Sequence, residues 1–254
     1  METKEVFRVD TKEEMYNHLI EINPEMNGHY VWYYDNGQKR KEGYYLNGLP
    51  HGKVYWYKDG SIYGDGNFVD GKRDGKQFTF FPNGVIQIEE YYVDGIREGD
   101  KRLYYESGKL KRVDKWVNGY KESPSISYYE DGQIKSETDY EDGVEVSVTT
   151  YWENGNVKEI QQYNGDYENN KRDGSRVQYY SNGKLRWNTE YKDGLREGRS
   201  VRLYENGQMK HYLHFKNGQL HGSCWTWTKK TYKEGRQIRL DEWDEMNSKM
   251  NGMR

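Results

Sequence analysis

The stretch GHYVWYYDNG, residues 28–37, is the pattern that the rest of the chain repeats. Seven further copies follow it, and a partial ninth follows those. Each copy has a glycine at its tip, the point where we expect the chain to turn, and successive tips are 23 or 24 residues apart except for one interval of 28. A fixed period of this length is the signature of a repeat architecture. The glycines at the tips, which we expect in tight turns, are Gly37, Gly60, Gly84, Gly108, Gly132, Gly155, Gly183 and Gly207.

Aromatic residues hold fixed places around each tip. The residue three before the tip is always aromatic: Tyr34, Tyr57, Phe81, Tyr105, Tyr129, Trp152, Tyr180 and Tyr204. The residue eight after the tip is also aromatic: Tyr45, Phe68, Tyr92, Trp116, Tyr140, Tyr163, Tyr191 and Phe215. With alternating apolar residues on both sides of the tip, each copy is predicted to be a β-hairpin.

The seventh copy indicates how each hairpin pairs. Val177 and Tyr179 alternate before the tip, and Leu185 and Trp187 alternate after it. A two-residue loop would divide these side chains between the two faces of the hairpin. A three-residue loop ending at Gly183 pairs Tyr179 with Leu185 and places all of them on one face. We therefore predict the three-residue loop, with the tip glycine in the left-handed conformation.

A second pair of glycines, such as Gly194 and Gly198, connects each hairpin to the next. The residue before the second glycine is often acidic or histidine, as at His51, Asp74, Glu98, Glu197 and His221. So short a return predicts that neighbouring hairpins pair with each other. The expected fold is mainly β: about eight and a half β-hairpins in one elongated, twisted antiparallel sheet, with short capping helices at the termini.

The N-terminal residues lie outside the repeat. Residues 1–27 are predicted to form an N-terminal cap, since a solenoid must cover its terminal apolar face. Within this cap we expect a short strand over 6–9 and a helix over about 11–22. The repeats then occupy residues 28–235.

The C-terminal residues 236–254 also lack the repeat. They are predicted to form a capping helix over about 239–250, with a partner-binding helix as the alternative. The repeat is also irregular near 164–173, where the segment Tyr167–Asn170 is inserted. This insertion is either neutral drift or a protrusion shaped for a partner.

Composition excludes several classes of protein. Hydrophobic residues make up 33% of the chain, charged residues 32%, and mean hydropathy is −1.27, so a thick apolar core is excluded. The 26 Tyr and 8 Trp favour a thin sheet over disorder, because tyrosine buries its ring and keeps its hydroxyl wet. The net charge of −3, with both signs interspersed, shows no nucleic-acid footprint. The single Cys224 excludes an intramolecular disulfide framework.

Residues that could carry catalysis or bind a metal do not converge. His211 and His214 point to opposite faces of their predicted strand, and no four ligands for zinc come together. The phosphate-loop motif is absent. We expect no enzymatic activity and no cofactor. We expect a monomer that binds a protein, with neither nucleic acid nor a membrane as partner, because no polybasic cluster is present. No apolar run follows Met1, which favours a cytoplasmic location.

The motif Tyr-Tyr-x-Asn-Gly, then an aromatic, then Asn/Asp-Gly-x-x-x-Gly, is complete from Tyr33 to Gly52 and from Tyr179 to Gly198. It resembles the MORN-variant repeat family, including the YwqK-like antitoxins, over residues 28 to about 235. The resemblance implies a repeat fold and a non-catalytic antitoxin or immunity protein that neutralises a partner toxin by occlusion. The alternative is a structural or membrane-associated MORN-type scaffold. Repeats of this kind serve many partners, so the resemblance specifies the fold more closely than the function.

The aromatic residues three before each tip leave the predicted apolar face and form a row on the opposite one. They either stabilise the sheet by cross-strand stacking or provide a surface for a protein partner, and both roles can hold together. The middle repeats adjoin the irregular segment, which gives a feature that identical repeats lack. The candidate partner-binding residues are therefore Tyr105, Tyr129, Trp152, Tyr180 and Tyr167.

Overall fold

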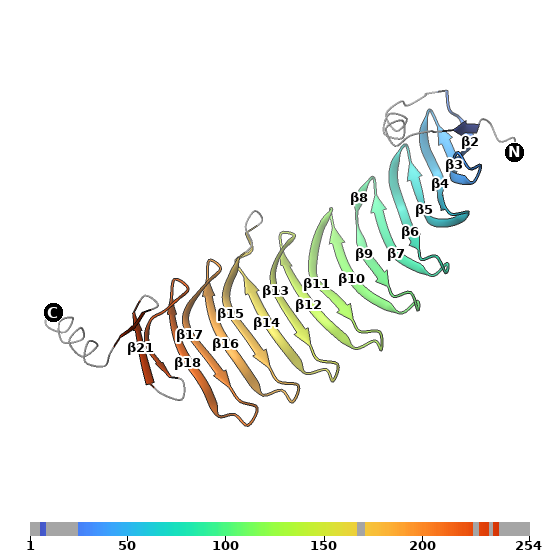
Figure 1. Ribbon diagram of the computed structural model, residues 1–254. Helices are drawn as coiled ribbons and strands as arrows, with labels where there is room; N and C mark the ends of the chain where they lie inside the picture. Colours follow the sequence, from blue (N-terminus) through green and yellow to red (C-terminus); the bar gives the residue numbers. More distant parts are fainter. Residues whose placement is uncertain (1–5, 9–24, 167–170, 226–228, 234–235, 239–254) are drawn as a thin grey trace. The chain divides into compact units, whose positions relative to one another are not determined.

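The computed structural model describes residues 6–8, 25–166, 171–225, 229–233 and 236–238 of the 254-residue chain. Every regular element in these residues is a β-strand, so the chain is all-β here, as expected. Strands run side by side and turns line both edges of the sheet (Figure 1). The predicted helices over 11–22 and 239–250 lie outside the described residues.

The chain divides into two compact units, of which unit 1 is Met1–Gly132. The predicted strand near residue 6 is confirmed, and it pairs in parallel with β2. The other pairings described in this unit are antiparallel. The strands are β1 (Val6–Arg8), β2 (Gly28–Tyr33), β3 (Lys39–Leu46), β4 (Leu49–Lys58), β5 (Ser61–Val69), β6 (Lys72–Phe80), β7 (Ile86–Val93), β8 (Ile96–Arg97), β9 (Gly99–Tyr104), β10 (Leu110–Val117) and β11 (Tyr120–Tyr128).

Unit 2 is Gln133–Arg254, and its described strands pair antiparallel. The connection from β14 to β15 is longer than in other copies, as the irregular sequence predicted. Its base is closed by Asn164, whose N–H donates to the Lys171 carbonyl at 3.0 Å. The strands are β12 (Ile134–Glu141), β13 (Val144–Tyr151), β14 (Val157–Tyr163), β15 (Arg172–Tyr179), β16 (Leu185–Lys192), β17 (Leu195–Leu203), β18 (Met209–Lys216), β19 (Gln219–Leu220), β20 (Gly222–Trp225), β21 (Lys229–Lys233) and β22 (Arg236–Ile238).

The tip loops confirm the predicted geometry in the seventh copy. Tyr179 pairs with Leu185, and the N–H of Gly183 donates to the Tyr180 carbonyl at 2.9 Å. Gly183 has φ +81°, and all eight tip glycines have positive φ. The Oδ1 atom of Asn182 accepts from the N–H of Lys184 at 3.0 Å, which explains the asparagine before the glycine.

The second copy departs from this rule. Its tip is a two-residue loop, because Lys58 pairs with Ser61 and both Asp59 and Gly60 have positive φ. Aspartate–glycine with two left-handed residues is a favoured hairpin turn of this length. The three-residue loop is thus common in the repeat but not universal.

The prediction that all apolar side chains share one face is wrong. In the seventh copy Tyr179 pairs with Leu185, but the next pair is Gln178 with Trp187, so Arg186 is an extra residue. This β-bulge shifts the register by one residue and moves Trp187 to the face opposite Tyr179. The same shift occurs between Arg202 and Leu203 in the eighth copy. The apolar residues therefore change face part-way along each hairpin.

The return turns at the opposite edge are two-residue Asn-Gly or Asp-Gly loops. Both residues have positive φ, as at Asp193 (51°) and Gly194 (83°). Successive turns are joined by hydrogen bonds, since the N–H of Gly218 donates to the Arg196 carbonyl at 2.9 Å. The acid before the second glycine takes part, because a carboxylate oxygen of Glu197 accepts from the N–H of Asn217 at 2.7 Å. These contacts align the hairpins within each unit.

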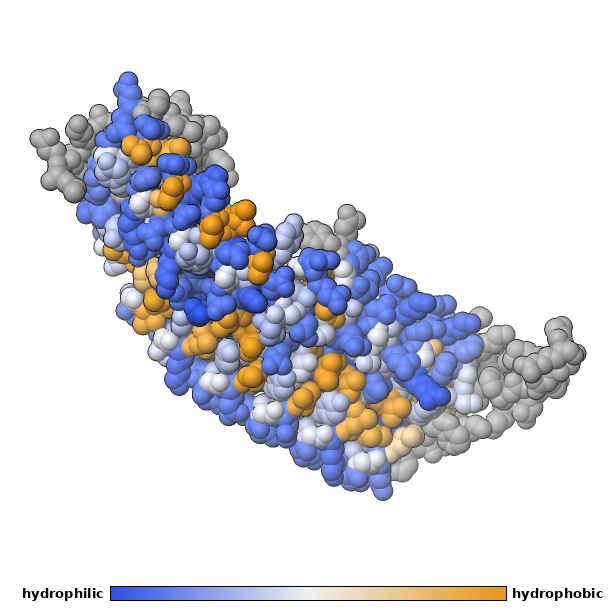
Figure 2. All heavy atoms as spheres, turned by 180° about the vertical axis from the view of Figure 1, so that it is seen from behind, coloured by the Kyte–Doolittle hydropathy of each residue, from blue (hydrophilic) through white to orange (hydrophobic). Residues whose placement is uncertain are grey.

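Side chains cover the sheet without building a thick core. The buried apolar residues are few in the described part of the chain, and Val54 at 0% exposure is the largest fully buried one in unit 1. Figure 2 shows hydrophobic side chains in separate patches among hydrophilic ones. This distribution agrees with the low hydropathy of the sequence.

Candidate binding surface

The two faces of the sheet carry different side chains. Face A bears the aromatic residue eight after each tip, such as Tyr92 and Tyr191, both buried. Face B bears the residue four before most tips, such as Phe80 and Tyr179. Residues paired across antiparallel strands share a face, which assigns the remaining positions.

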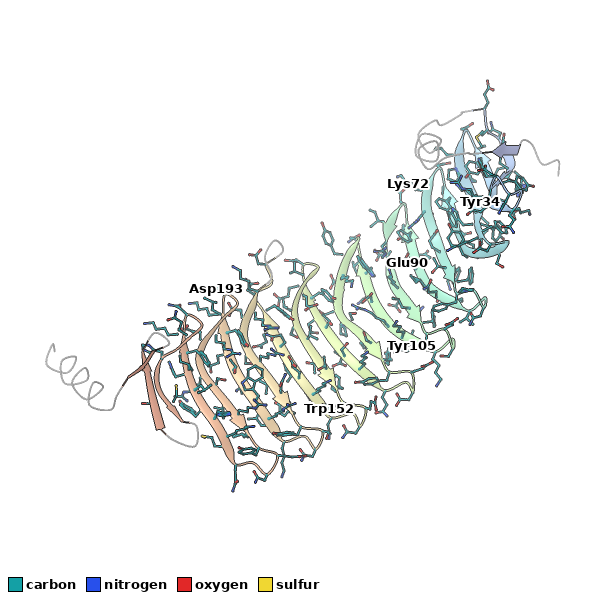
Figure 3. The ribbon with its side chains drawn as sticks, viewed as in Figure 1. Tyr34, Lys72, Glu90, Tyr105, Trp152 and Asp193 are labelled. Carbon is teal, nitrogen blue, oxygen red and sulfur yellow. The ribbon has the colours of Figure 1, made fainter. Side chains whose placement is uncertain are left out.

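The predicted aromatic row connects neighbouring hairpins near their tips. Tyr34 and Tyr105 lie near the tip edge of unit 1, and Lys72 lies at the opposite edge (Figure 3). In four copies, the side-chain O–H or N–H of the row residue donates a hydrogen bond to a backbone carbonyl of the next hairpin. These contacts are Tyr34 Oη to Tyr57 O at 3.0 Å, Tyr105 Oη to Tyr128 O at 2.7 Å, Trp152 Nε1 to Tyr179 O at 3.3 Å and Tyr180 Oη to Leu203 O at 2.9 Å.

A cationic side chain covers many of the same rings. It belongs to the bulge residue three after the tip, so the bulge places a positive charge over the aromatic ring of its own hairpin. The contacts are Arg40 over Tyr34 at 5.9 Å, Lys111 over Tyr105 at 5.4 Å, Lys158 over Trp152 at 4.6 Å, Arg186 over Tyr180 at 5.6 Å and Lys210 over Tyr204 at 5.1 Å.

These contacts bear on the candidate partner-binding residues. Tyr105, Tyr129, Trp152 and Tyr180 are all half-buried. For three of them a polar hydrogen is already donated to the backbone, as described above. Tyr167 lies outside the described residues. A role in partner binding stays a prediction for this row, whereas its role in joining hairpins is visible in the structure.

We predict that Tyr180→Phe lowers the free energy of unfolding by about 1 kcal/mol, because it removes one hydrogen bond and keeps the ring. Chemical denaturation of the purified chain measures the change. Phe81 occupies this position in the third copy, so the ring alone is compatible with the hairpin. An unchanged midpoint would show that the hydroxyl contributes nothing to the junction with Leu203.

Charged and aromatic side chains alternate on face A near the return turns. Arg97 lies over the rings of Tyr92 at 5.4 Å and Trp116 at 4.3 Å. It also donates to Tyr92 Oη at 2.9 Å and forms an ion pair with Glu90 at 3.0 Å. Lys101 contacts the same Glu90 oxygen at 2.8 Å. The charges in this part of face A are paired with one another, so the cluster stabilises the sheet.

Asp114 is the most deeply buried acid in this cluster, at 4% exposure. Burial alone would raise the pKa of its carboxyl group, but hydrogen bonds from Ser125 and Arg112 and the charge of Lys121 outweigh burial. The pKa therefore lies below its usual value. A depressed folded-state pKa means that the ionised carboxylate stabilises the fold.

We predict that Asp114→Asn lowers the free energy of unfolding at neutral pH by about 1.5–3 kcal/mol, the range for hydrogen bonds to charged groups. The contribution is complete above the unfolded-state pKa of about 3.9 and is lost as pH falls through the folded-state pKa. The gap between wild type and variant should therefore shrink in acid. Asp100→Asn is the control, because Asp100 is exposed where it pairs with Arg102. A gap that stays constant down to pH 3 would contradict this role.

Apolar side chains, all exposed except the half-buried Val117, gather on face B of unit 1, beside the return turns. We call this set the apolar strip; it consists of Leu46, Val69, Val93, Ile96, Val117 and Tyr120. Val69, Val93 and Ile96 are 47%, 47% and 51% exposed, and Tyr120 is 62% exposed. Two neighbours on the same face, Tyr44 and Tyr91, are also more than two-fifths exposed.

The strip is continuous across the return turns of Val93 and Val117, whereas Val69 pairs with Lys72, whose aliphatic stem lies over Gly95 of the next turn. Val93 pairs with Ile96 across its return turn, and Val117 pairs with Tyr120 across the next. The side chain of Ile96 lies over Gly119 of the following turn, where an added Cβ would be 3.5 Å from Ile96 Cγ2. The turns after Val93 and Val117 therefore each add an apolar pair to the line, and the turn after Val69 adds one apolar side chain beside Lys72.

Unit 2 carries polar residues at one of the two repeat positions that form the strip; at the other, twelve after the tip, it has Val144 and Leu195, and Leu195 is 51% exposed. Nine residues after the tip, unit 1 has Leu46, Val69, Val93 and Val117, whereas unit 2 has Glu141, Asn164, Lys192 and Lys216. The return turns have the same backbone conformation in both units: φ is positive at Asp94 in unit 1 and at Asp193 in unit 2. The hairpin therefore does not need an apolar residue at this position.

Among the residues that the structure describes, no group of three or more His, Cys, Asp or Glu side chains could hold a metal ion. The same residues contain no helix long and apolar enough to cross a membrane.

A comparison with protein families assigns the repeat. The MORN repeat variant pattern matches residues 26–47, 73–94, 97–118, 121–142, 145–164, 172–193 and 196–217. These segments cover more than half of the 254 residues. The chain belongs to the MORN repeat variant family. The sequence pattern predicted this family, and the match does not extend to the antitoxins within it.

The MORN-variant matches omit one of the eight copies. The segment around Gly60 is unmatched, and it is the copy whose tip is a two-residue loop. Trp56 and Val54 of this copy share face A with Gly64 and Gly66, so its strand before the tip presents the opposite set of residues. The copy outside the matched ranges is therefore also the copy with the shorter loop.

The other comparisons add no functional argument. No curated protein matches the chain. Among solved structures, one titled "Crystal Structure of TcdB2-TccC3-Cdc42" matches at 11% identity and a TM-score of 0.20. The match covers 80% of this chain and 13% of that chain. A TM-score this low supports no conclusion about this MORN-variant chain.

The apolar strip was not predicted, although the sequence carries a signal for it. The repeat pattern consists of what the copies share, and the strip is a difference between copies. Leu46, Val69, Val93 and Val117 stand where the last four copies have Glu, Asn, Lys and Lys. A sudden change from apolar to charged at one position of a repeat indicates a surface with a separate role.

Proposed function

We propose that this MORN-variant chain is a non-catalytic protein-binding module whose interface is the apolar strip of unit 1. The observation that carries the proposal is the exposure of the strip. Contiguous exposed apolar residues on a soluble protein mark interaction sites, whereas isolated ones need no explanation. The strip spans four successive hairpins, and the polar residues nine after the tips of unit 2 indicate that the fold does not require apolar residues at that position.

The aromatic row is the weaker candidate for this interface. The hydroxyl groups of Tyr105 and Tyr180 donate to the backbone of the next hairpin, and cations cover both rings. A partner would have to displace these contacts before it could use the rings. Val69, Val93 and Ile96 of the strip are open to solvent without any rearrangement.

The antitoxin or immunity role is the specific form of this proposal that the family resemblance implied. In that form the partner is a toxin, and binding through the strip places the sheet over the toxin's active site or docking surface. Co-expression with a candidate toxin tests it: the wild-type chain should restore growth, and a chain with a charged strip should not. If both chains restore growth equally, the strip is not the surface that occludes the toxin.

The general proposal is tested by capture from a lysate of the source organism. Wild-type chain and the double variant Val69→Lys/Val93→Lys serve as parallel baits, with quantification by mass spectrometry. A protein counts as a partner only if its capture falls with the variant and it binds again when purified. If no captured protein depends on the strip, the proposed interface is wrong.

A further inference from the structure

We infer that the partner segment that occupies the apolar strip is an amphipathic α-helix with basic residues beside its apolar stripe. This inference rests on the proposed function and adds the chemistry of the partner. Two properties of the strip lead to it: the spacing of its apolar residues, and the charges along its border.

The spacing of the strip matches a helix. Equivalent residues of successive hairpins, such as Val69, Val93 and Val117, are separated by two strands, or about 9.6 Å at the usual strand spacing. Residues seven apart on an α-helix lie on one stripe and are separated by about 10.5 Å. Over these three hairpins the mismatch is about 2 Å, which side chains can accommodate.

An extended partner strand fits the strip less well. Side chains on one face of a strand recur about every 6.8 Å, so its apolar residues would lose alignment with the strip after a single hairpin. The strip also lies on the face of the sheet, away from any open edge, so its backbone groups are already paired. A helix satisfies its own backbone groups and needs only side-chain contacts.

The border of the strip nearest the turns is acidic. Asp70 and Asp94 are both more than 70% exposed; His51 lies 3.3 Å from Asp70, and Lys72 pairs with Asp94 at 2.7 Å. The carboxylates of Asp74 and Glu98 lie on the same side, where each accepts from a turn N–H at 3.0 and 2.8 Å. This border therefore favours positive charge on the flank of the helix that faces it.

On the opposite border of the strip basic and acidic side chains occur in equal pairs, whereas on the turn side the acids Asp70, Asp74, Asp94 and Glu98 outnumber Lys72. Lys53 is paired with Asp65 at 2.5 Å, and Lys76 is paired with Glu89 at 2.9 Å. Lys115 lies in register between Asp100 and Glu122. The attraction for a basic helix thus comes from the turn side, and its other flank has no strong charge requirement.

The test uses designed peptides and the full chain. Three labelled peptides of about 21 residues, or three heptads, are compared by fluorescence anisotropy. The first has leucines on one helical stripe with Lys and Arg beside it. The second has the same composition in scrambled order. The third keeps the leucine stripe and replaces Lys and Arg by Glu.

We expect the first peptide to bind at least about tenfold more tightly than the other two, and to gain helical circular dichroism on binding. Val93→Lys should weaken its binding about tenfold. Asp70→Asn/Asp94→Asn should weaken it as well, and these changes suit the turn because Asn118 and Asn217 occupy the same position. Asp193→Asn in unit 2 is the matched control and should leave binding unchanged.

Three results would overturn the inference. These are no binding of the first peptide, equal binding of the first and scrambled peptides, or equal binding of the first peptide to wild type and Val93→Lys. Failure of the proposed function has a different signature. If a captured partner depends on the strip but is not displaced by the first peptide, the interface stands and the helix is wrong. If the peptide binds but no partner depends on the strip, the proposed function fails.

Discussion

Replacing Gly43 by valine is expected to lower the free energy of unfolding by about 3 kcal/mol, near the upper end for an overpacked site. A Cβ at Gly43 would lie 2.8 Å from Val54 Cγ2, 3.2 Å from the Lys53 carbonyl oxygen and 3.3 Å from Val54 Cα. Two of these three atoms belong to the backbone and cannot rotate away. Val54 is fully buried opposite Gly43, and Tyr30, on the other neighbouring strand, is 5% exposed.

Chemical denaturation of both chains measures the effect. Gly207→Ala is the control, because φ is +87° there and nothing lies within 4 Å of an added Cβ. Its cost should be only that of left-handed backbone, about 1–2 kcal/mol. Comparison with Gly43→Ala, where φ is ordinary, separates crowding from backbone strain. A Gly43→Val chain as stable as wild type would mean that face A is not packed as described.

The double variant Val69→Lys/Val93→Lys is expected to weaken partner binding at least about 100-fold, which corresponds to about 2.7 kcal/mol. Two apolar anchors near the centre of an interface readily account for a loss of this size. Stability should stay within about 0.5 kcal/mol per site, since both side chains are half-exposed. Lysine is also compatible with the hairpin, because Lys192 and Lys216 occupy the same position in unit 2.

The matched control carries Lys192→Ser/Lys216→Ser, which alters the same repeat position in unit 2. We expect its affinity for the partner to equal that of wild type, as measured by isothermal titration calorimetry. Circular dichroism and thermal unfolding verify the fold of every chain. A strip variant that binds like wild type would remove the strip from the interface. A unit 2 variant that loses affinity would move the interface to unit 2.

Much of the fold follows from the repeat itself. The glycine spacing predicted the hairpins, and the tip of the seventh copy has the predicted pairing of Tyr179 with Leu185. The bulge at Arg186 was missed because a period of two was carried through the whole strand. Several copies carry a basic residue three after the tip, such as Lys158 or Lys210, and this was the signal in the sequence. In the structure, these residues have no paired residue on the neighbouring strand. One elongated sheet over the whole chain stays a prediction.

The candidate site was harder to predict because a repeat pattern is defined by what its copies have in common. An aromatic residue recurs three before all eight tips, and that regularity indicates a need shared by every hairpin. In four copies the hydrogen bond to the next hairpin, such as that from Tyr180 to the Leu203 carbonyl, meets this need, and in the third copy the ring of Phe81 does so without it. Binding depends instead on what differs between copies. Val93 and Lys192 differ at one position, and only the structure shows that Val93 is exposed beside Ile96.

Hydrogen–deuterium exchange of the full chain, alone and saturated with a purified partner, tests the central claim most directly. Partner contact slows exchange in the backbone that it covers or steadies. We predict slower exchange in segments 67–72, 91–96 and 115–120, at the return turns of unit 1. The equivalent segment 190–195 of unit 2 should exchange as in the free chain. Slowing confined to unit 2 or to the hairpin tips, with the unit 1 return turns unchanged, would contradict the apolar strip as the interface.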